Sequence, residues 1–222
     1  MGKITNDKDY HILIEKRARA VSKRIVDVLV AVIGIIVTAP IMVLIAICIK
    51  LEDKGPVLFV QTRTGQNGEL FSIYKFRSMR FCPRNKNQKK YGQGWDKGVP
   101  DSFIFKDGSV ANPNVTKVGV IIRRTSLDEL PQFFNVLLGD MSIVGPRPEI
   151  PEITAYYSKE QRTRLLVKPG ITGWAQVNGR SLITNGEKMR MDHHYVLHQS
   201  LYLDICILML TIKVVLTSKG AV

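Results

Sequence analysis

The run Ile25-Val-Asp-Val-Leu-Val-Ala-Val-Ile-Gly-Ile-Ile-Val-Thr-Ala-Pro-Ile-Met-Val-Leu-Ile-Ala-Ile-Cys-Ile49 decides the fold class of this 222-residue chain, because it is the only long apolar stretch. Its one charge is Asp27. An ordinary core helix is rarely apolar all round, so the run predicts membrane insertion. It starts too late and is too long for a signal peptide, and it lacks a clear small-residue cleavage site. We expect Asp27 to pair with Arg24 at the membrane interface.

Two features bear on whether this run crosses the bilayer. A straight helix of this length reaches about 37 Å, enough for a hydrocarbon core of roughly 30 Å. Pro40, however, removes a backbone donor and clashes with the carbonyl four residues earlier. Basic residues also crowd both ends, in residues 16–24 before the run and at Lys50, Lys54 and Arg63 after it. The positive-inside rule therefore tolerates both ends on the cytoplasmic side. A re-entrant helix that bends near Pro40 fits both facts, whereas a kinked single span explains the second less well.

The composition is strongly basic. Thirty-two Lys and Arg against 19 Asp and Glu give a net charge of +13, which favours an anionic partner: a membrane face, a phosphorylated substrate or nucleic acid. The three cysteines, Cys48, Cys82 and Cys206, form no CxxC pair. They therefore support neither a disulfide framework nor a zinc site, and a reducing compartment is expected.

A hairpin is predicted directly after the apolar run. Residues 56–62 and 70–79 have strand character around the turn Gly65-Gln-Asn-Gly68. A period of two places Lys75 and Arg77 at the end of an apolar face of the second strand. These cations can meet a phosphate, or they can lie on a solvated rim, as edge-strand cations often do.

Beyond the hairpin, residues 81–114 are rich in Gly, Pro, Asn, Lys and Asp, which predicts an irregular surface excursion, a lid or a specificity loop. Helices are expected over residues 115–124 and 150–166. The apolar tail over residues 201–216 is interrupted by charges and predicts an interfacial helix packed against the first membrane segment.

Asp128 and Glu129 are adjacent carboxylates, preceded by Arg123 and followed by Arg147 in a Gly-Pro-Arg-Pro turn. Carboxylates flanked by guanidinium groups suit phosphate chemistry, with one side supplying a nucleophile or metal ligand and the other a clamp. A structural interpretation stands beside this one, because Ser126-x-x-Glu129 is also a capping-box pattern. Either Ser126 caps the next helix or Pro131 begins it. In both cases the acids lie near a helix N-terminus, where carboxylates stay ionised.

Residues 168–180 read as a glycine-rich loop. Its glycines let backbone approach a ligand, and Trp174 either supports a nucleobase or, more commonly, packs into the core. His193, His194 and His198 lack both an HExxH pattern and a cysteine partner, so a zinc site there is not favoured.

These motifs together resemble the bacterial sugar transferases, the monotopic phosphoglycosyl transferases that move a sugar-1-phosphate from a UDP-sugar to polyprenyl phosphate. The matching stretches are Lys75-Phe-Arg-Ser-Met, Arg123 through Asp128-Glu129-Leu-Pro-Gln, Gly139-Asp-Met-Ser-Ile-Val-Gly-Pro-Arg-Pro148 and Lys168-Pro-Gly-Ile-Thr-Gly-Trp-Ala-Gln-Val-Asn-Gly-Arg180. The resemblance runs from about residue 23 to the C-terminus, except for residues 81–114.

The resemblance implies a mainly α, membrane-associated monotopic domain with a small β-hairpin, interfacial amphipathic helices and a re-entrant helix broken at Pro40. Its parts are a basic segment (residues 1–24), the re-entrant helix (25–50) and a catalytic domain on the cytoplasmic face of the bacterial inner membrane (51–222). Ala39 precedes Pro40, where the family often has Ser, so Thr38 is expected to satisfy the freed carbonyl.

The same resemblance assigns the site. Asp128 is implied as the nucleophile that forms a phosphosugar–aspartyl intermediate and releases UMP. Glu129 is its acid/base or metal partner, with Mg²⁺ held by both carboxylates. The substrate phosphates are bound by Arg123, Arg147 and Lys75, and the nucleotide-sugar loop contributes Trp174, Gln176, Asn178 and Arg180. The partners are then the UDP-sugar, polyprenyl (undecaprenyl) phosphate and membrane lipid, in a pathway that builds capsule, exopolysaccharide, O-antigen or a protein-linked glycan.

Two other functions fit parts of the sequence. A non-catalytic scaffold that binds anionic lipid explains the charge and the apolar run, but it leaves the Asp-Glu pair and the Gly-Pro-Arg-Pro turn without purpose. Nucleic-acid binding is disfavoured because the basic residues are scattered and no nucleic-acid motif is present. The donor sugar is not identified by the sequence. Residues 81–114 and 181–190 are where its selection is expected, and a homodimer is a further assembly that the sequence allows.

Overall fold

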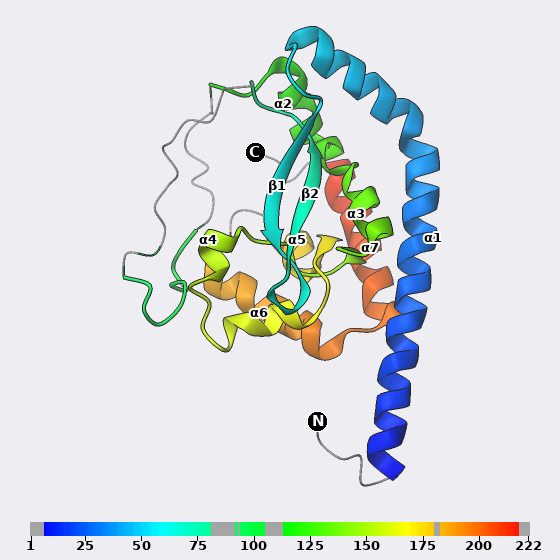
Figure 1. Ribbon diagram of the computed structural model, residues 1–222, viewed down its shortest axis with the longest axis vertical. Helices are drawn as coiled ribbons and strands as arrows, with labels where there is room; N and C mark the ends of the chain where they lie inside the picture. The colour runs from blue at the N-terminus through cyan, green and yellow to red at the C-terminus, as the bar shows by residue number, and fades with distance from the viewer. Residues whose placement is uncertain (1–6, 81–91, 93, 105–112, 180–182, 218–222) are drawn as a thin grey trace.

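The computed structural model describes residues 7–80, 92, 94–104, 113–179 and 183–217 (Figure 1). Its elements follow in the order α1 (Asp7–Glu52), β1 (Leu58–Thr64), η1 (Gln66–Gly68), β2 (Leu70–Phe76), α2 (Lys117–Arg124), η2 (Leu127–Glu129), α3 (Gln132–Leu138), β3 (Ser142–Val144), α4 (Pro151–Thr154), η3 (Gln161–Leu166), β4 (Gly170–Thr172), α5 (Trp174–Asn178), α6 (Asn185–His198) and α7 (Leu201–Thr217), where η marks a 3-10 helix. The described chain is mainly helical with a small hairpin, as predicted.

Helix α1 contains the whole apolar run and continues through Pro40. The part of α1 towards residue 52 runs in a different direction from its long first part (Figure 1). Proline removes one backbone donor and crowds the carbonyl four residues earlier, here that of Ile36, so a bend is the expected consequence. The helix is thus bent and not broken. The prediction for Thr38 was wrong, because its hydroxyl donates to the Gly34 carbonyl at 2.6 Å and not to that of Ile36.

The described residues contain one helix, over Ala20–Glu52, that is long and apolar enough to cross a membrane. Only 11% of its most apolar 18-residue window is buried. Large apolar side chains such as Ile33, Ile36 and Val37 are exposed along it. A core helix of a soluble domain would be mostly covered, so this exposure suggests that the helix associates with a membrane.

The N-terminal end of the apolar run is tied to the rest of the molecule by polar contacts. The Asp27 carboxylate is buried, and its Oδ1 accepts hydrogen bonds from Ser142 Oγ at 2.9 Å and Ile143 N at 3.0 Å. The prediction that Asp27 pairs with Arg24 was wrong. Arg24 instead donates to the carbonyls of Val136 and Leu137 at the end of α3, where a cation complements the helix dipole.

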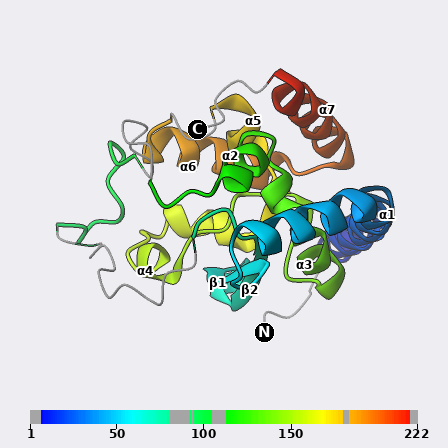
Figure 2. The ribbon, with the colours of Figure 1, turned by 90° about the horizontal axis from the view of Figure 1, so that it is seen from above.

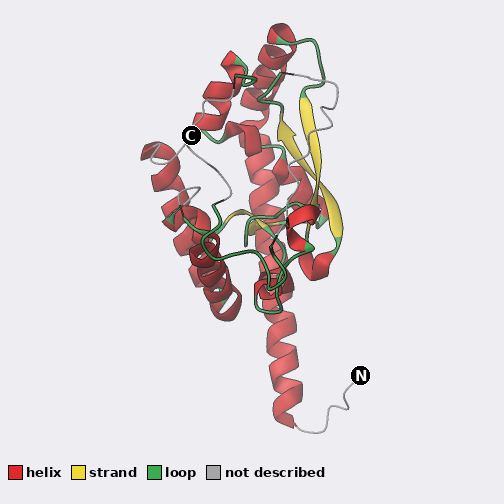
Figure 3. Cartoon of the chain, turned by 90° about the vertical axis from the view of Figure 1, so that its left-hand side faces the viewer, coloured by secondary structure: helices red, strands yellow, loops and turns green. Residues whose placement is uncertain are grey.

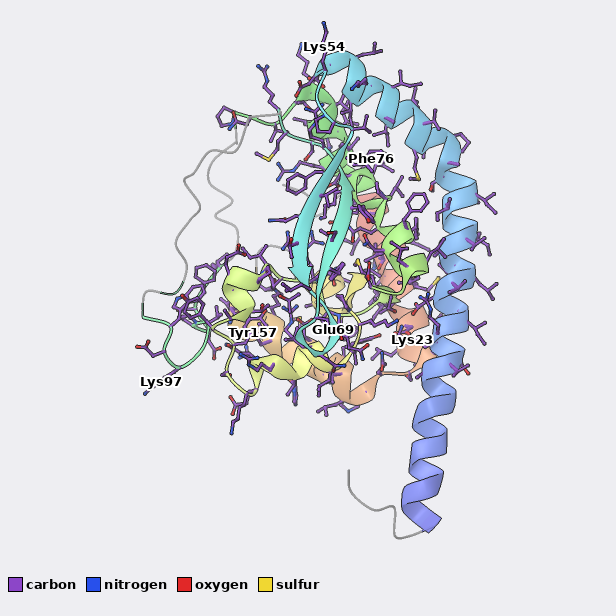
Figure 4. All side chains as sticks on the ribbon, viewed as in Figure 1. Lys23, Lys54, Glu69, Phe76, Lys97 and Tyr157 are labelled. Carbon is purple, nitrogen blue, oxygen red and sulfur yellow. The ribbon has the colours of Figure 1, made fainter. Side chains whose placement is uncertain are left out.

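The C-terminal end of the run also contacts the folded domain. Ile45 and Ile49 pack in a buried cluster with Phe76 and Ile122. The Glu52 carboxylate accepts the first two backbone N–H groups of α2, at 2.7 and 2.9 Å. Figure 4 shows Lys23 where α1 meets the domain and Lys54 beyond the other end of the helix. The first part of α1 projects past the rest of the molecule, as Figure 3 shows.

Strands β1 and β2 pair antiparallel, with Phe59 opposite Lys75 and Arg63 opposite Phe71. This confirms the predicted hairpin. A second pairing was not predicted: β3 and β4 are parallel, with Ser142 opposite Gly170. Two three-residue strands have too little pattern to be recognised before their partner is known.

The main core packs around β3, with the buried residues Ala31, Ile73, Val136, Met141, Ile143, Val144, Tyr195 and Ile207. Helix α2 confirms the helix predicted over residues 115–124. The single helix predicted over residues 150–166 was wrong, because that segment divides into α4 and η3. Helix α7 confirms the helical tail, but it packs mainly against α5, β3 and β4. Figure 2 shows α7 away from the hairpin, and Lys23–Asp204 at 2.7 Å links it to α1.

Most of the segment 81–114 lies outside the described residues. Its described part is anchored by aromatic contacts, since Trp95 packs edge-on against Phe103 and Tyr156 with ring centroids 5.0 and 5.6 Å apart. The buried side chains of Ile153 and Tyr157 complete this cluster. That part of the predicted excursion is therefore fixed to the domain by burial.

Candidate active site

Glu129 is the centre of the candidate site. Its Oε1 atom lies 2.8 Å from Lys75 Nζ and 2.8 Å from Arg147 Nη2. Lys75 comes from β2, Glu129 from η2, and Arg147 from the turn after β3. The structure thus brings together three residues that the sequence selected from three separate motifs. Glu129 and Lys75 are 17% and 14% exposed, while Arg147 is 44% exposed. A ligand can therefore reach the guanidinium from solvent.

The backbone around the acidic pair has an unusual conformation. Ser126 has φ 58° and ψ 17°, in the left-handed region that residues other than glycine rarely adopt. Its side chain makes no capping bond, so the capping-box interpretation was wrong. Glu129 cannot complete such a box, because its carboxylate is turned to Lys75 and Arg147. Pro131 directly precedes α3 in the N-cap position, one residue earlier than predicted.

The two adjacent carboxyls have opposite pKa shifts. Burial alone would raise the pKa of Glu129, but Arg147 and Lys75 outweigh it and hold that pKa far below its ordinary value. The pKa of Asp128 is raised, first by burial and then by the neighbouring Glu129 charge, against the opposing effect of Lys75 and Arg147. The lowered pKa of Glu129 favours the predicted ionised state, whereas the shift of the Asp128 pKa is in the opposite direction. One carboxylate thus holds the cations, and the neighbouring carboxylate is the more basic of the two.

The cations at the site respond to the same neighbours. Burial lowers the pKa of Lys75, followed by the Arg147 charge, while Glu129 opposes this shift. Arg123 lies in the last turn of α2, is partly buried and favours the ionised form of the Asp128 carboxyl, which opposes the rise of its pKa. Within the described part of the chain the Arg123 side chain makes no hydrogen bond or ion pair, so its guanidinium remains available.

Arg77 belongs to another contact. It donates to Asp53 Oδ2 and to the Asp53 carbonyl, both at 2.6 Å, and so fastens the end of the hairpin to the end of α1.

Arg63 was missed as a site residue. It donates to the Pro148 carbonyl at 3.3 Å and lies on the same face of the hairpin as Lys75, since Arg63 is opposite Phe71. The hairpin register could have revealed it, because side chains two residues apart share a face.

The Gly-Pro-Arg-Pro turn lies directly against residues 168–170. A Cβ atom on Gly145 would fall 2.3 Å from the Lys168 carbonyl oxygen, and one on Gly170 would fall 2.1 Å from Gly145 N. Only glycine permits this approach. The predicted nucleotide loop is therefore in part a β-strand whose glycines let the Arg147 turn pack closely.

The remaining residues of that predicted loop are occupied locally. Trp174 packs against the main core. Gln176 donates to the Ile171 carbonyl at 3.1 Å, and Asn178 donates to the Trp174 carbonyl at 2.8 Å. Arg180 lies outside the described residues. The structure thus does not bring Trp174, Gln176 or Asn178 into contact with the Glu129 ion pairs.

Two of the three histidines stack on each other, and the third contacts a threonine. His194 and His198 stack with ring centroids 4.3 Å apart, and His194 lies 6.0 Å from the Trp174 ring. His193 Nδ1 and the Thr163 hydroxyl are 3.1 Å apart. No group of three or more metal-ligating side chains occurs among the described residues.

With this geometry established, the chain can be compared with known proteins. Residues 18–218 match the family model described as "Bacterial sugar transferase". The chain belongs to the bacterial sugar transferase family.

Two relatives of this sugar transferase have names that state an activity. It is 42% identical over 205 residues to the UDP-N-acetylgalactosamine-undecaprenyl-phosphate N-acetylgalactosaminephosphotransferase of Aeromonas hydrophila, covering 90% of this chain and 44% of that protein. It is 39% identical over 207 residues to the UDP-glucose:undecaprenyl-phosphate glucose-1-phosphate transferase of Escherichia coli, covering 90% and 41%. The chain is also 39% identical over 198 residues to EpsL, an uncharacterized sugar transferase of Bacillus subtilis. That match covers 89% of this chain and 89% of EpsL. The chain therefore spans less than half the length of the first two relatives.

The carboxylates of this sugar transferase fit Mg²⁺ by their chemistry. Mg²⁺ is usually held by one or two carboxylates together with substrate phosphates and water. Both cations contact Oε1 of Glu129, and no hydrogen bond reaches its Oε2 or the Asp128 carboxylate from the described residues. Two adjacent carboxyl groups thus have oxygen atoms to offer.

Proposed function

We propose that this sugar transferase moves a sugar-1-phosphate from a UDP-sugar to polyprenyl phosphate and releases UMP, as the first membrane step of a bacterial glycoconjugate pathway. The names of the Aeromonas and Escherichia relatives support the reaction class. The observation that carries the proposal is the convergence of Lys75 and Arg147 on Glu129 beside Asp128. That arrangement places a nucleophile among cations that suit a diphosphate.

In the proposed reaction an Asp128 carboxylate oxygen attacks the phosphorus that carries the sugar. The bond from this phosphorus to the bridging oxygen breaks, and UMP leaves with that electron pair. A phosphate oxygen of the polyprenyl acceptor then attacks the same phosphorus, and the bond to Asp128 breaks. The raised pKa of Asp128 supports this role, because a more basic carboxylate is a better nucleophile once it is ionised.

Glu129 and the cations prepare the site for negative charge. The very low pKa of Glu129 makes this group a poor general acid or base near neutral pH. We therefore assign Glu129 to holding Lys75 and Arg147 and, with Asp128, to holding Mg²⁺. When bound, Mg²⁺ supplies positive charge to the phosphates. Arg147 and Arg123 are the proposed phosphate contacts, and Lys75 adds a third cation.

The contacts of α1 support a re-entrant helix. Asp27 near one end of the apolar run and Ile49 at the other both pack against the same folded domain. If the run crossed the bilayer, one of these ends would lie on the far side, away from a domain that needs water. Bending near Pro40 lets both ends return to one face. We place the domain on the cytoplasmic face of the inner membrane, where UDP-sugars are made.

UMP release tests the reaction. The purified protein with undecaprenyl phosphate and Mg²⁺ is assayed against a panel of UDP-sugars, and at least one donor should release UMP. Asp128→Asn should abolish turnover while the protein still enters the membrane fraction. Full activity of that variant would refute the covalent step. If the wild-type protein released UMP from none of the UDP-sugars, the proposed function would be refuted.

Single-cysteine labelling tests the topology. Ala20→Cys and Lys54→Cys, each in a protein without its native cysteines, place an exposed thiol at either end of the helix. A membrane-impermeant thiol reagent added to intact spheroplasts should leave both unlabelled and should label both after lysis. Labelling of only one of the two positions in intact spheroplasts would establish a spanning helix.

A further inference from the structure

The backbone that carries Arg147 is held by two other arginines. Arg164 Nη2 donates to the Arg147 carbonyl at 2.7 Å. Arg63 Nη1 donates to the next carbonyl, that of Pro148, at 3.3 Å. Pro148 also has a fixed φ, so it offers little freedom between these two contacts. Arg147 therefore rests on a backbone that neighbouring side chains hold in place.

The following residue is fixed both through its backbone and through its side chain. The Glu149 carbonyl accepts a hydrogen bond from Thr64 N of β1 at 2.9 Å. Its carboxylate, only 9% exposed, pairs with Lys188 of α6. Three consecutive carbonyls, from Arg147 to Glu149, are thus each hydrogen-bonded to another part of the chain.

Arg164 is the most deeply buried member of this set. Its side chain is 2% exposed, and Nη2 lies 2.7 Å from the Asp192 carboxylate, which is 1% exposed. Nη1 donates to the Tyr157 hydroxyl at 2.7 Å. The guanidinium is therefore held by Asp192 of α6 and by Tyr157, three residues after the end of α4, while it donates to the Arg147 backbone.

Stability alone does not account for such a group. The desolvation of a buried ion pair costs several kcal/mol per ion, and replacing the pair with apolar side chains is often neutral or stabilising. A guanidinium can, however, donate in several fixed directions at once. Here two of those directions end on a hydroxyl and on the backbone of a residue that contacts Glu129, and the buried Asp192 carboxylate forms an ion pair with the same guanidinium.

We propose that Arg164 is a positioning residue for the transfer reaction, holding the Arg147 backbone so that the Arg147 guanidinium meets both Glu129 and the donor phosphate. This proposal rests on the proposed function. Arg164 does not touch the substrate; it acts through Arg147. Displacing a catalytic group by about 1 Å can cost on the order of 10²-fold in rate, and a lysine at position 164 cannot make all three contacts.

A double-mutant cycle tests this coupling. Arg164→Lys should lower kcat/KM by on the order of 10²-fold in the wild-type background. In the Arg147→Ala background it should have almost no further effect, because the group that it positions is gone. Arg77→Lys is the matched control, since Arg77 is equally buried and also binds a carboxylate and a backbone carbonyl. Arg77→Lys should change kcat/KM by the same factor in the wild-type and Arg147→Ala backgrounds. Equal factors for Arg164→Lys in both backgrounds would overturn the proposal.

Hydrogen exchange gives a readout that does not need turnover. The Thr64 amide donates to the Glu149 carbonyl. Its hydrogen exchange should therefore be faster in Arg164→Lys than in the wild-type protein, and its exchange rate should be unchanged in Arg77→Lys. Tyr157→Phe removes one contact of Arg164 without removing a charge, and it should give the same two effects more weakly if Arg164→Lys does not fold. If the wild-type protein shows no UMP release, the proposed function falls. The exchange rate of the Thr64 amide then tests by itself whether Arg164 holds the backbone of residues 147–149. An unchanged rate in Tyr157→Phe or Arg164→Lys would refute that hold.

Discussion

The pairing of Lys75 with Glu129 allows a prediction about both stability and pH dependence. Lys75→Met keeps the length of the side chain and removes its charge. At 2.8 Å the gross Coulomb energy of the pair is about 6 kcal/mol for an effective dielectric constant near 20. Desolvation of the ammonium offsets several kcal/mol of this, and Arg147 stays on the same oxygen. We expect a net loss of about 2 kcal/mol, typical of a hydrogen bond to a charged group.

That loss should appear as a fall of about 4–8 °C in the apparent Tm of detergent-solubilised protein, given the length of the chain. The loss should shrink at low pH. The pKa of Glu129 is depressed in the folded state, so its stabilisation is present above the ordinary value of 4.5 and declines as the pH falls below it. Lys159→Met, which removes an exposed lysine, is the control and should change the Tm by less than about 1 °C.

The same substitution should change the pH profile of turnover. Lys75 favours the ionised form of Asp128, so removing it should raise the pKa of Asp128 further. The proposed nucleophile must be ionised, and the acidic limb of kcat/KM should therefore move to higher pH. A profile and a Tm that both match the wild type would show that the Lys75–Glu129 pair does not act on Asp128, and the electrostatic reasoning would be wrong.

Three further predictions follow from the structure. Asp128→Asn should raise the apparent Tm at pH 8 even though it should abolish UMP release. The pKa of Asp128 is raised in the folded state, so the stability that its protonated form contributes is lost as the pH rises from 3.8 through the folded-state pKa. The gain should shrink as the pH is lowered towards 3.8, and a lower Tm at pH 8 would refute this. Ser126→Ala should lower the free energy of unfolding by less than about 0.5 kcal/mol, because the Ser126 side chain makes no capping bond. Thr184→Ala should lower it by about 1 kcal/mol, because Thr184 and Glu187 form a true capping box. Denaturant titrations of both variants measure this contrast, and equal losses would contradict it. Gly119→Ala should destabilise the protein by about 1–3 kcal/mol, since its Cβ would lie 2.0 Å from the Ser78 carbonyl oxygen. Val120→Ala, on the exposed face of α2, is the control. A wild-type Tm for Gly119→Ala would show that α2 can move to relieve the clash.

Much of the fold could be predicted because its signals are local. The apolar run of α1 is recognisable from residue type alone, and the hairpin from alternation around a glycine turn. Helix α1 was predicted to break at Pro40, but it bends and remains a continuous helix on both sides of the proline. The segment 150–166 looked like one amphipathic helix, yet it contains α4 and η3, which turn so that Arg164 can reach the interior. Tertiary burial outweighed local propensity there.

The acidic pair shows the same division in the candidate site. The sequence by itself determined that two carboxylates follow one another beside an arginine-bearing turn, because these are properties of neighbouring residues. It also suggested a capping box, which has the right spacing but is not formed. Only the tertiary structure decided that Glu129 faces Lys75, 54 residues away, and Arg147, 18 residues away. Those two contacts hold the pKa of Glu129 low, while burial raises the pKa of adjacent Asp128. The two acids have opposite pKa shifts because the dielectric surroundings and charges at each carboxyl come from distant segments that folding brings together.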